Sequence, residues 1–236
     1  MGRGRRGADR ASRARVRSVS RARGRTVRIS GAGTAAQTRA LHAHRRALVA
    51  QLREEIGVPA TPAGRASLVI VMGYPGVGKS HCARLLASAL AGAHVATDHL
   101  RSRLFIAPSY AEEENAAVFG IAEALVDELL AEGHRVVLDA THLLRRSRAP
   151  AERVAVARGV PVHHVLVTAD DADTRARLDT RGRERAADDH SDADVRVYER
   201  MRERGFEPPA SYLEIRNGPL VSDEIARVVA MIAGGA

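Results

Sequence analysis

Residues 68–80 read LVIVMGYPGVGKS, and this stretch decides the fold. The first five residues are apolar and strand-like, and residues 81–90 carry apolar side chains at helical spacing. The residues between them match the phosphate-binding pattern G-x-x-x-x-G-K-[ST] in full, as Gly73, Tyr74, Pro75, Gly76, Val77, Gly78, Lys79 and Ser80. Strand, glycine-rich turn and helix follow in the order that a P-loop requires, so a chance match in an ordinary turn is disfavoured.

This motif predicts a nucleotide site made by the whole turn. Backbone N–H groups of a glycine-rich turn and the positive end of the next helix together form an anion site. Lys79 is the only lysine of the chain, and a compact ammonium suits the β- and γ-phosphates better than the planar fork of arginine. The Ser80 hydroxyl is expected to bind Mg²⁺. The predicted ligands are therefore ATP and Mg²⁺.

Composition divides the chain into a basic tail and a nearly neutral body. Residues 1–30 hold eleven arginines and one aspartate, a net charge of +10 within a total of +9, so residues 31–236 sum to about −1. We expect a disordered tail over 1–33, an amphipathic helix and linker over 34–66, and one P-loop domain over 67–236. The tail is either an arm for nucleic acid, a solvated segment or an over-extended start of the reading frame.

Other compositional features point to a soluble protein. The single cysteine, Cys82, excludes an internal disulfide and fits a reducing compartment. No apolar stretch approaches membrane-spanning length, so we expect a cytoplasmic protein without a membrane partner. An arginine- and serine-rich start is also typical of an organellar transit peptide.

Five apolar strand-like runs alternate with helical patterns, at 68–72, 93–97, 135–140, 160–168 and, weakly, 211–215. This alternation predicts an α/β fold whose parallel sheet of about five strands is covered by helices on both faces. Ligands of such sheets bind at the carboxyl ends of the strands. The candidate residues at these ends are Asp98 and Arg101, Asp139, and the series Arg175, Arg177, Arg181 and Arg183.

Each candidate has a plain alternative. Asp98 could cap the helix that follows it, and Arg101 could be a solvated surface residue. Asp139 ends a hydrophobic strand near the P-loop, which favours a link to Mg²⁺. The arginine series could be ordinary surface, because this chain uses arginine throughout, although a spacing of four puts Arg177 and Arg181 on one helix face.

In this order the motifs resemble the P-loop kinase family that includes the kinase domains of polynucleotide kinases, related small kinases and zeta-type toxins. The resemblance runs from about Leu68 to Pro209. It rests on the phosphate loop, Asp98-x-x-Arg101, Asp139-x-Thr141 with Arg148 after it, residues 157–161, the arginines at 177, 181 and 183, and residues 191–192 to 206–209.

The resemblance implies a nucleoside-kinase-like fold with an arginine-rich lid, and a role for each candidate. Asp98 would deprotonate an acceptor hydroxyl, and Arg101 would hold the acceptor's own anionic group. Arg177 and Arg181 would close over ATP. In polynucleotide kinases an asparagine usually follows the threonine after strand three, whereas this chain has His142.

The function expected from these features is transfer of the γ-phosphoryl of ATP to an acceptor hydroxyl, on a small metabolite or a polynucleotide 5′ end. The body has 3% aromatic residues, which leaves few platforms for base stacking and favours a small acceptor. Two alternatives of other classes stay open: a regulatory ATPase with no acceptor other than water, and a nucleic-acid-binding protein on an inactive kinase scaffold.

Overall fold

The structure is a computed structural model that describes residues 44–105, 108–183 and 194–234. The predicted basic tail and the first ten residues of the predicted helix-and-linker segment at 34–66 lie outside the described residues. Within the described ranges, no helix is long and apolar enough to cross a membrane.

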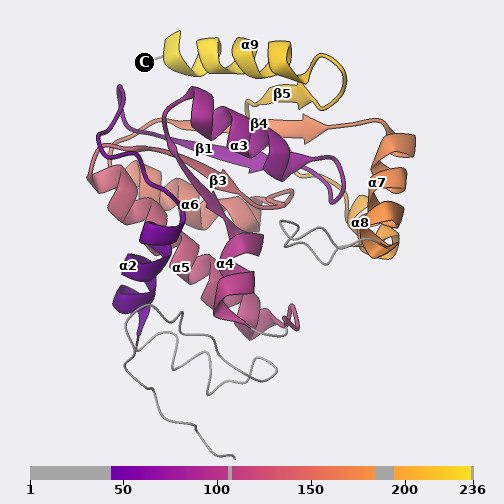
Figure 1. Ribbon diagram of the computed structural model, residues 1–236, viewed down its shortest axis with the longest axis horizontal. Coiled ribbons are helices and arrows are strands. Elements are labelled where there is room, and N and C mark those ends of the chain that lie inside the picture. Colours follow the sequence, from indigo (N-terminus) through magenta and orange to yellow (C-terminus); the bar gives the residue numbers. More distant parts are fainter. Residues whose placement is uncertain (1–43, 106–107, 184–193, 235–236) are drawn as a thin grey trace, which may run out of the picture.

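The core of the fold is a five-stranded sheet in the order β2-β3-β1-β4-β5, in which every neighbouring pair is parallel (Figure 1). Its strands are β1 Ser67–Met72, β2 Ala93–Ala96, β3 Arg135–Asp139, β4 Val162–Thr168 and β5 Leu213–Arg216. All five predicted strands are present. The predicted α/β P-loop fold is confirmed, with the sequence-predicted strand ends shifted by one to two residues.

Helices connect the strands and cover both faces of the sheet. They are α2 Arg45–Glu55, α3 Lys79–Ala89, α4 Thr97–Leu104, α5 Glu112–Ala131, α6 Arg145–Ala157, α7 Asp171–Arg183, α8 Val195–Arg204 and α9 Val221–Gly234. In Figure 1, α3 and α9 lie on one side of the sheet and α2, α4, α5 and α6 on the other. The helices α7 and α8 lie beyond the carboxyl ends of the strands.

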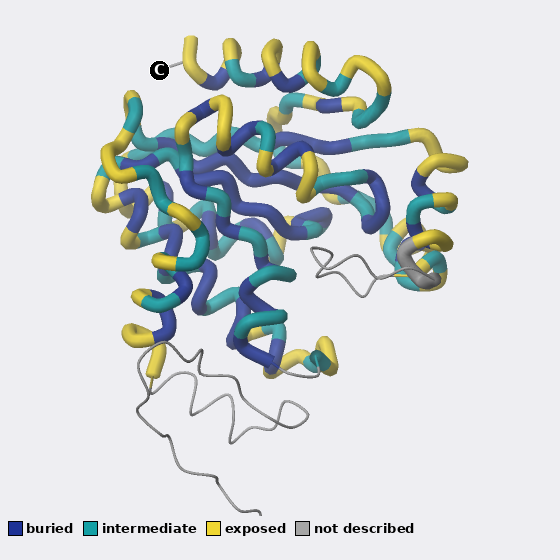
Figure 2. The backbone as a smooth tube through the Cα atoms, viewed as in Figure 1, coloured by how far each residue is buried: buried dark blue, intermediate teal, exposed yellow. Residues whose placement is uncertain are grey.

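The central strand β1 is buried on both faces, as expected for a parallel sheet (Figure 2). Its residues point alternately into two separate hydrophobic cores. Leu68, Ile70 and Met72 pack with the core under α2, α4, α5 and α6. Val69 and Val71 pack with the core under α3 and α9. Because helices cover both faces, a ligand can reach the sheet only at the ends of its strands.

Helix α2 packs onto the P-loop domain and shares its core. Leu48, Val49 and Leu52 are buried in the cluster that α5 also lines. At its C-terminal end, α2 forms ion pairs with the C-cap residue of α5, through Arg53–Glu132, and with α4, through Glu55–Arg103. This predicted amphipathic helix is therefore part of the domain's hydrophobic core in the structure.

Candidate functional site

The P-loop wraps around the side chain of Lys79. The Gly73 amide donates to the Thr141 carbonyl at 3.1 Å, which ties the start of the turn to the segment after β3. The Lys79 ammonium donates to the Tyr74 carbonyl at 2.9 Å. Helix α3 begins at Lys79, so its first N–H groups and positive end point into the turn. This is the anion-binding geometry that the motif predicts.

Two glycines of the turn are required by close neighbours as well as by backbone conformation. Gly78 has a φ of 88°, and a Cβ there would lie 2.0 Å from the Nδ2 atom of Asn217. Gly76 has a φ of 81°, and its Cβ would lie 2.7 Å from Leu178 in α7. The backbone of the turn is thus packed against both the β5–α9 connection and α7.

Asn217 is a residue of this site that the sequence reasoning missed. Its side-chain amide donates to the Val77 carbonyl at 2.8 Å, and its backbone amide donates to the Thr168 carbonyl at 2.8 Å. It follows β5 directly, so the rule applied to the other strand ends would have found it. The weak sequence pattern of the last strand obscured it.

Ser80 and Asp139 lie together, as expected for residues that share a cation. Asp139 is buried, and His94 Nε2 lies 3.3 Å from its Oδ2, while Ser80 is close enough to lower the pKa of the carboxylate. Burial alone would raise the pKa of Asp139, but the His94 contact, the charge of Lys79 and the nearby Ser80 outweigh it and lower the pKa. The carboxylate is therefore ionised near neutral pH.

An ionised carboxylate and a serine hydroxyl beside a phosphate site fit Mg²⁺, which takes oxygen ligands and leaves other positions to phosphates and water. No cluster of three or more His, Cys, Asp or Glu side chains in the described ranges could hold a metal by itself. A cation at Ser80 and Asp139 would therefore depend on the nucleotide.

The contact between His94 and Asp139 comes from strand register. Ala96 pairs with Asp139 across β2 and β3, and His94 lies two residues earlier, on the same face of the sheet. No local sequence signal marks a histidine within a strand as the neighbour of a carboxylate more than forty residues away. The sequence reasoning therefore could not find His94.

Asp98 lies in the first turn of α4. Like the P-loop, it is at the carboxyl ends of the strands. The preceding residue, Thr97, donates from its hydroxyl to the Asp139 carbonyl at 3.3 Å. Asp98 is half-buried and is not the N-cap, which is Ala96. Its position next to the end of β3 allows contact with a ligand held there.

Arg101 follows Asp98 by one turn, but its charge is engaged inside the protein. It forms a buried ion pair with Glu114 of α5 and donates to the Asn115 side chain at 2.7 Å. Its guanidinium also lies over the Tyr110 ring, 4.5 Å from the centroid. The expected contact with an acceptor would require these partners to be given up.

The two predicted lid arginines lie on α7, which packs on the P-loop. Arg177 lies next to the turn, with Nη1 3.5 Å from the Gly76 carbonyl. Leu178 and Thr174 are buried against the same glycine. Arg181 belongs to α7, but its side chain lies outside the described part of the chain.

The segment after Asp139 is fixed by a buried arginine. Arg148 donates to the carbonyls of His142 and Glu207, at 2.8 and 2.6 Å. The Glu207 carboxylate accepts from the Arg145 amide at the start of α6, at 2.7 Å. The contacts of Arg148 and Glu207 therefore hold the loop after β3 against the segment at 206–209.

His142 is buried in this loop, in a left-handed conformation with a φ of 45°. Its ring lies 5.9 Å from the ring of Phe119, and neither ring nitrogen has a hydrogen-bond partner in the structure. Burial lowers the pKa of His142 to about 4. The imidazole is therefore neutral near pH 7.

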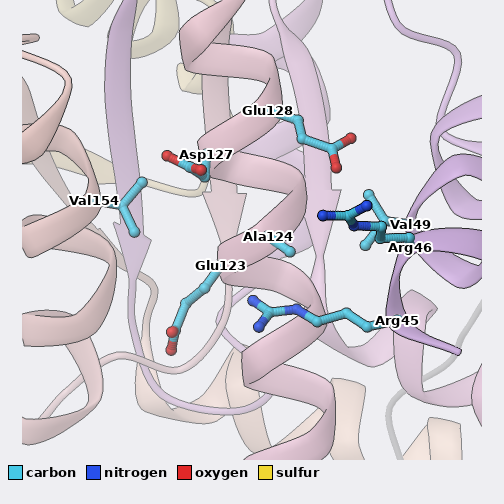
Figure 3. Close-up of a pocket in the computed structure, with 8 residues that line it drawn as sticks. All are labelled: Arg45, Arg46, Val49, Glu123, Ala124, Asp127, Glu128 and Val154. Carbon is cyan, nitrogen blue, oxygen red and sulfur yellow. The ribbon is translucent and has the colours of Figure 1, made fainter. Parts of the chain in front are cut away.

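A separate pocket of about 380 Å³ lies between α2, α5 and α6 (Figure 3). Its wall mixes arginines, carboxylates and small apolar side chains: Arg45, Arg46, Val49, Glu123, Ala124, Asp127, Glu128 and Val154. These α5 residues belong to the half of the helix that leads into the amino end of β3. The pocket is therefore remote from the carboxyl ends of the strands, where the P-loop lies. We assign it no part in the phosphate chemistry.

A parallel sheet of order 2-3-1-4-5, a glycine turn around a lysine and the helices α7 and α8 beyond the carboxyl ends of the strands define a P-loop kinase-like fold. The chain belongs to the AAA domain family designated AAA_33, whose model matches residues 68–209. A search of the curated proteins gives no match.

Solved structures with the same fold cover most of the body of the chain. A putative kinase from Chloroflexus aurantiacus is 15% identical with a TM-score of 0.60, and the match covers 72% of this chain and 98% of that one. Chaetomium thermophilum Kti12 in complex with ADP-AlF3 is 20% identical with a TM-score of 0.58, covering 70% and 96%. Mycobacterium tuberculosis APS kinase CysC in complex with AMPPNP and APS is 22% identical with a TM-score of 0.52, covering 72% and 99%. At these identities the likeness shows the fold.

Proposed function

We propose that this chain transfers the γ-phosphoryl of ATP to a hydroxyl group of an acceptor. The observation that supports the proposal is that Asp98 lies in the first turn of α4, directly after Thr97, whose hydroxyl donates to the Asp139 carbonyl at the carboxyl end of β3. A nucleotide-binding ATPase needs the P-loop, but a hydroxyl acceptor also requires a base, and the half-buried Asp98 follows β2, two strands from β1. Nucleotide use is further supported by two structures of this fold, which hold ADP-AlF3 and AMPPNP.

In the proposed reaction, the amides of residues 73–80 and the Lys79 ammonium bind the β- and γ-phosphates. Asp98 accepts the proton of the acceptor hydroxyl as its oxygen bonds to the γ-phosphorus. The bond from that phosphorus to the β–γ bridging oxygen breaks, and ADP leaves. Ser80 and Asp139 would hold Mg²⁺, which offsets negative charge on the phosphates when bound.

The lid arginines supply the remaining positive charge. Arg177 already lies at the Gly76 carbonyl, and we assign it and Arg181 to the equatorial oxygens of the transferring group, where cations stabilise the transition state. Closure of α7 over the nucleotide also excludes water, which limits ATP hydrolysis.

The test is transfer of radiolabelled γ-phosphate from ATP to pooled metabolites and to 5′-hydroxyl oligonucleotides. Asp98→Asn should lower transfer at least about 100-fold, the usual scale for loss of a general base, with ATP affinity nearly unchanged. Lys79→Ala should abolish both ATP binding and transfer. Asp173→Asn, an exposed aspartate of α7, is the matched control and should behave like the wild type.

The same assay separates the alternatives. Unchanged transfer by the Asp98 variant would refute the assignment of the base. ATP hydrolysis without a labelled acceptor would favour a regulatory ATPase. Nucleic-acid binding that disappears on deletion of residues 1–30, with no turnover by the remaining protein, would favour a binding protein on an inactive scaffold.

A further inference from the structure

We propose that the acceptor is an uncharged hydroxyl compound, because Glu114 neutralises the arginine that follows Asp98. The inference rests on the proposed function and concerns the same site. Arg101 is the residue expected to hold an anionic group of the acceptor. In the structure its guanidinium serves Glu114, Asn115 and Tyr110 instead.

Glu114 is fixed in place independently of Arg101. Its carboxylate accepts from the Ser109 amide at 2.7 Å, from the Ser109 hydroxyl at 2.8 Å and from the Tyr110 amide at 3.3 Å. The side chain is fully buried. Burial alone would raise the pKa of Glu114, but the bonds from Ser109 and Arg101 outweigh it and lower the pKa. The carboxylate is therefore ionised near neutral pH.

Arg101 cannot turn to an anion without leaving that charge exposed to a low-dielectric interior. Removing one partner of a buried ion pair is strongly unfavourable, because the remaining charge has neither water nor a counter-ion. The side chain of Arg101 is itself 5% exposed, and the Asn115 bond fixes the plane of its guanidinium. Arg101 is therefore a positioning residue that joins α4, which carries Asp98, to α5.

Within α4, α5 and loop 140–144, the described residues offer an anionic acceptor no arginine that is not already paired. The described residues of α4, α5 and loop 140–144 include two arginines, Arg101 and Arg103, and both are paired with glutamates. His142 in the loop is buried and neutral. A phosphate or sulfate on the acceptor, held against these three segments, would lose its hydration without gaining a counter-charge from them.

The experiment compares matched acceptors that differ by one phosphate. The probes are nucleosides against nucleoside 3′-monophosphates, and hexoses against hexose phosphates, each in the radiolabelled transfer assay with the full chain. The wild type should prefer the uncharged member of any pair it uses by at least about tenfold. Glu114→Gln, which frees the charge of Arg101, should shift that preference towards the phosphate-bearing member by at least about tenfold. Glu113→Gln changes an exposed glutamate of the same turn and should leave the preference unchanged.

Equal or better transfer by the wild type to the phosphate-bearing members would overturn the inference. A second measurement tests the charge argument without turnover. Proteins loaded with a non-hydrolysable ATP analogue and Mg²⁺ are titrated calorimetrically with inorganic phosphate. Glu114→Gln should bind phosphate at least about tenfold more tightly than the wild type and Glu113→Gln, and equal binding by all three would contradict the inference. If no acceptor is labelled, the proposed function loses its support while the titration still tests the inference.

A double variant covers the case in which Glu114→Gln does not fold. Arg101→Met combined with Glu114→Gln removes both charges, which buried ion pairs often tolerate. With folding verified by circular dichroism, kcat/KM for the best uncharged acceptor should stay within about tenfold of the wild type, since neither side chain contacts it. A decrease in kcat/KM of about 100-fold or more that comes from a higher KM would show that Arg101 binds the acceptor.

Discussion

The rings of Tyr74 in the P-loop and Tyr198 in α8 meet edge to face, with centroids 6.0 Å apart and planes at 85°. The Tyr198 hydroxyl donates to Asp171 of α7 at 2.7 Å. Arg175 and Arg202 lie over the same ring, 5.7 and 5.6 Å from its centroid. Tyr198 therefore connects the phosphate turn to both helices beyond the carboxyl edge.

Substitution of Tyr198 by leucine should weaken this connection. It removes an aromatic pair and a hydrogen bond, which together contribute about 1–3 kcal/mol to the free energy of unfolding. Tyr198→Phe keeps the ring and should lose about 1 kcal/mol at most. Urea unfolding measures the stability, and calorimetry with ADP measures the affinity, which should fall for leucine only. Equal losses for the two variants would mean that the ring contact contributes nothing.

Gly78→Ala should distort the P-loop. The backbone there has a φ of 88°, and the new Cβ would clash with the Asn217 amide. Backbone strain of this kind costs about 1–3 kcal/mol, and the turn carries it directly to the phosphate-binding amides. Urea unfolding and nucleotide titration should both register the change. Gly218→Ala is the control, because a Cβ at that position meets no atom within 4 Å. Adding Asn217→Gly should restore the stability lost to the clash, while the loss caused by backbone strain should remain.

His142 should make the protein less stable in mild acid. Its pKa of about 4 in the folded state lies below the ordinary 6.5, so the unfolded chain takes up the proton first as the pH falls. The stabilisation is complete above pH 6.5 and is lost as the pH falls towards 4, by about 2 kcal/mol between about pH 7 and about pH 5. His142→Asn, which tolerates the left-handed backbone, should lack this component. Urea unfolding of both proteins at the two pH values tests it, and equal differences would contradict the burial argument.

Helix α2 should contribute to the stability of the whole domain. Leu52 is 2% exposed within the shared core, and truncation of a buried leucine to alanine costs about 2–5 kcal/mol. Arg46→Ala, on the exposed side of the same helix, should stay within about 0.5 kcal/mol. Thermal or urea unfolding as one transition is expected for both variants. A separate early transition for Leu52→Ala would show that α2 unfolds independently.

Much of the fold followed from local patterns. The P-loop is contiguous, and alternating strand and helix patterns imply parallel crossovers, so the five strands and their helices were predictable. The structure differed from the predictions where the contact partner of a residue is distant in the sequence. Arg101 was expected to hold an anionic group of the acceptor, but Glu114 on another helix engages its charge. Asn217 and His94 reach their contacts through neighbouring strands, which the local patterns do not specify.

The sequence by itself determined the phosphate turn, the parallel sheet and the carboxylates at the ends of β2 and β3, because each depends on residues that are adjacent or regularly spaced. Tertiary structure alone decided that α2 completes the core, that His94 lies against Asp139, and that Glu114 neutralises Arg101. These contacts join residues from different elements. They depend on strand register and helix packing, which arise from the fold as a whole.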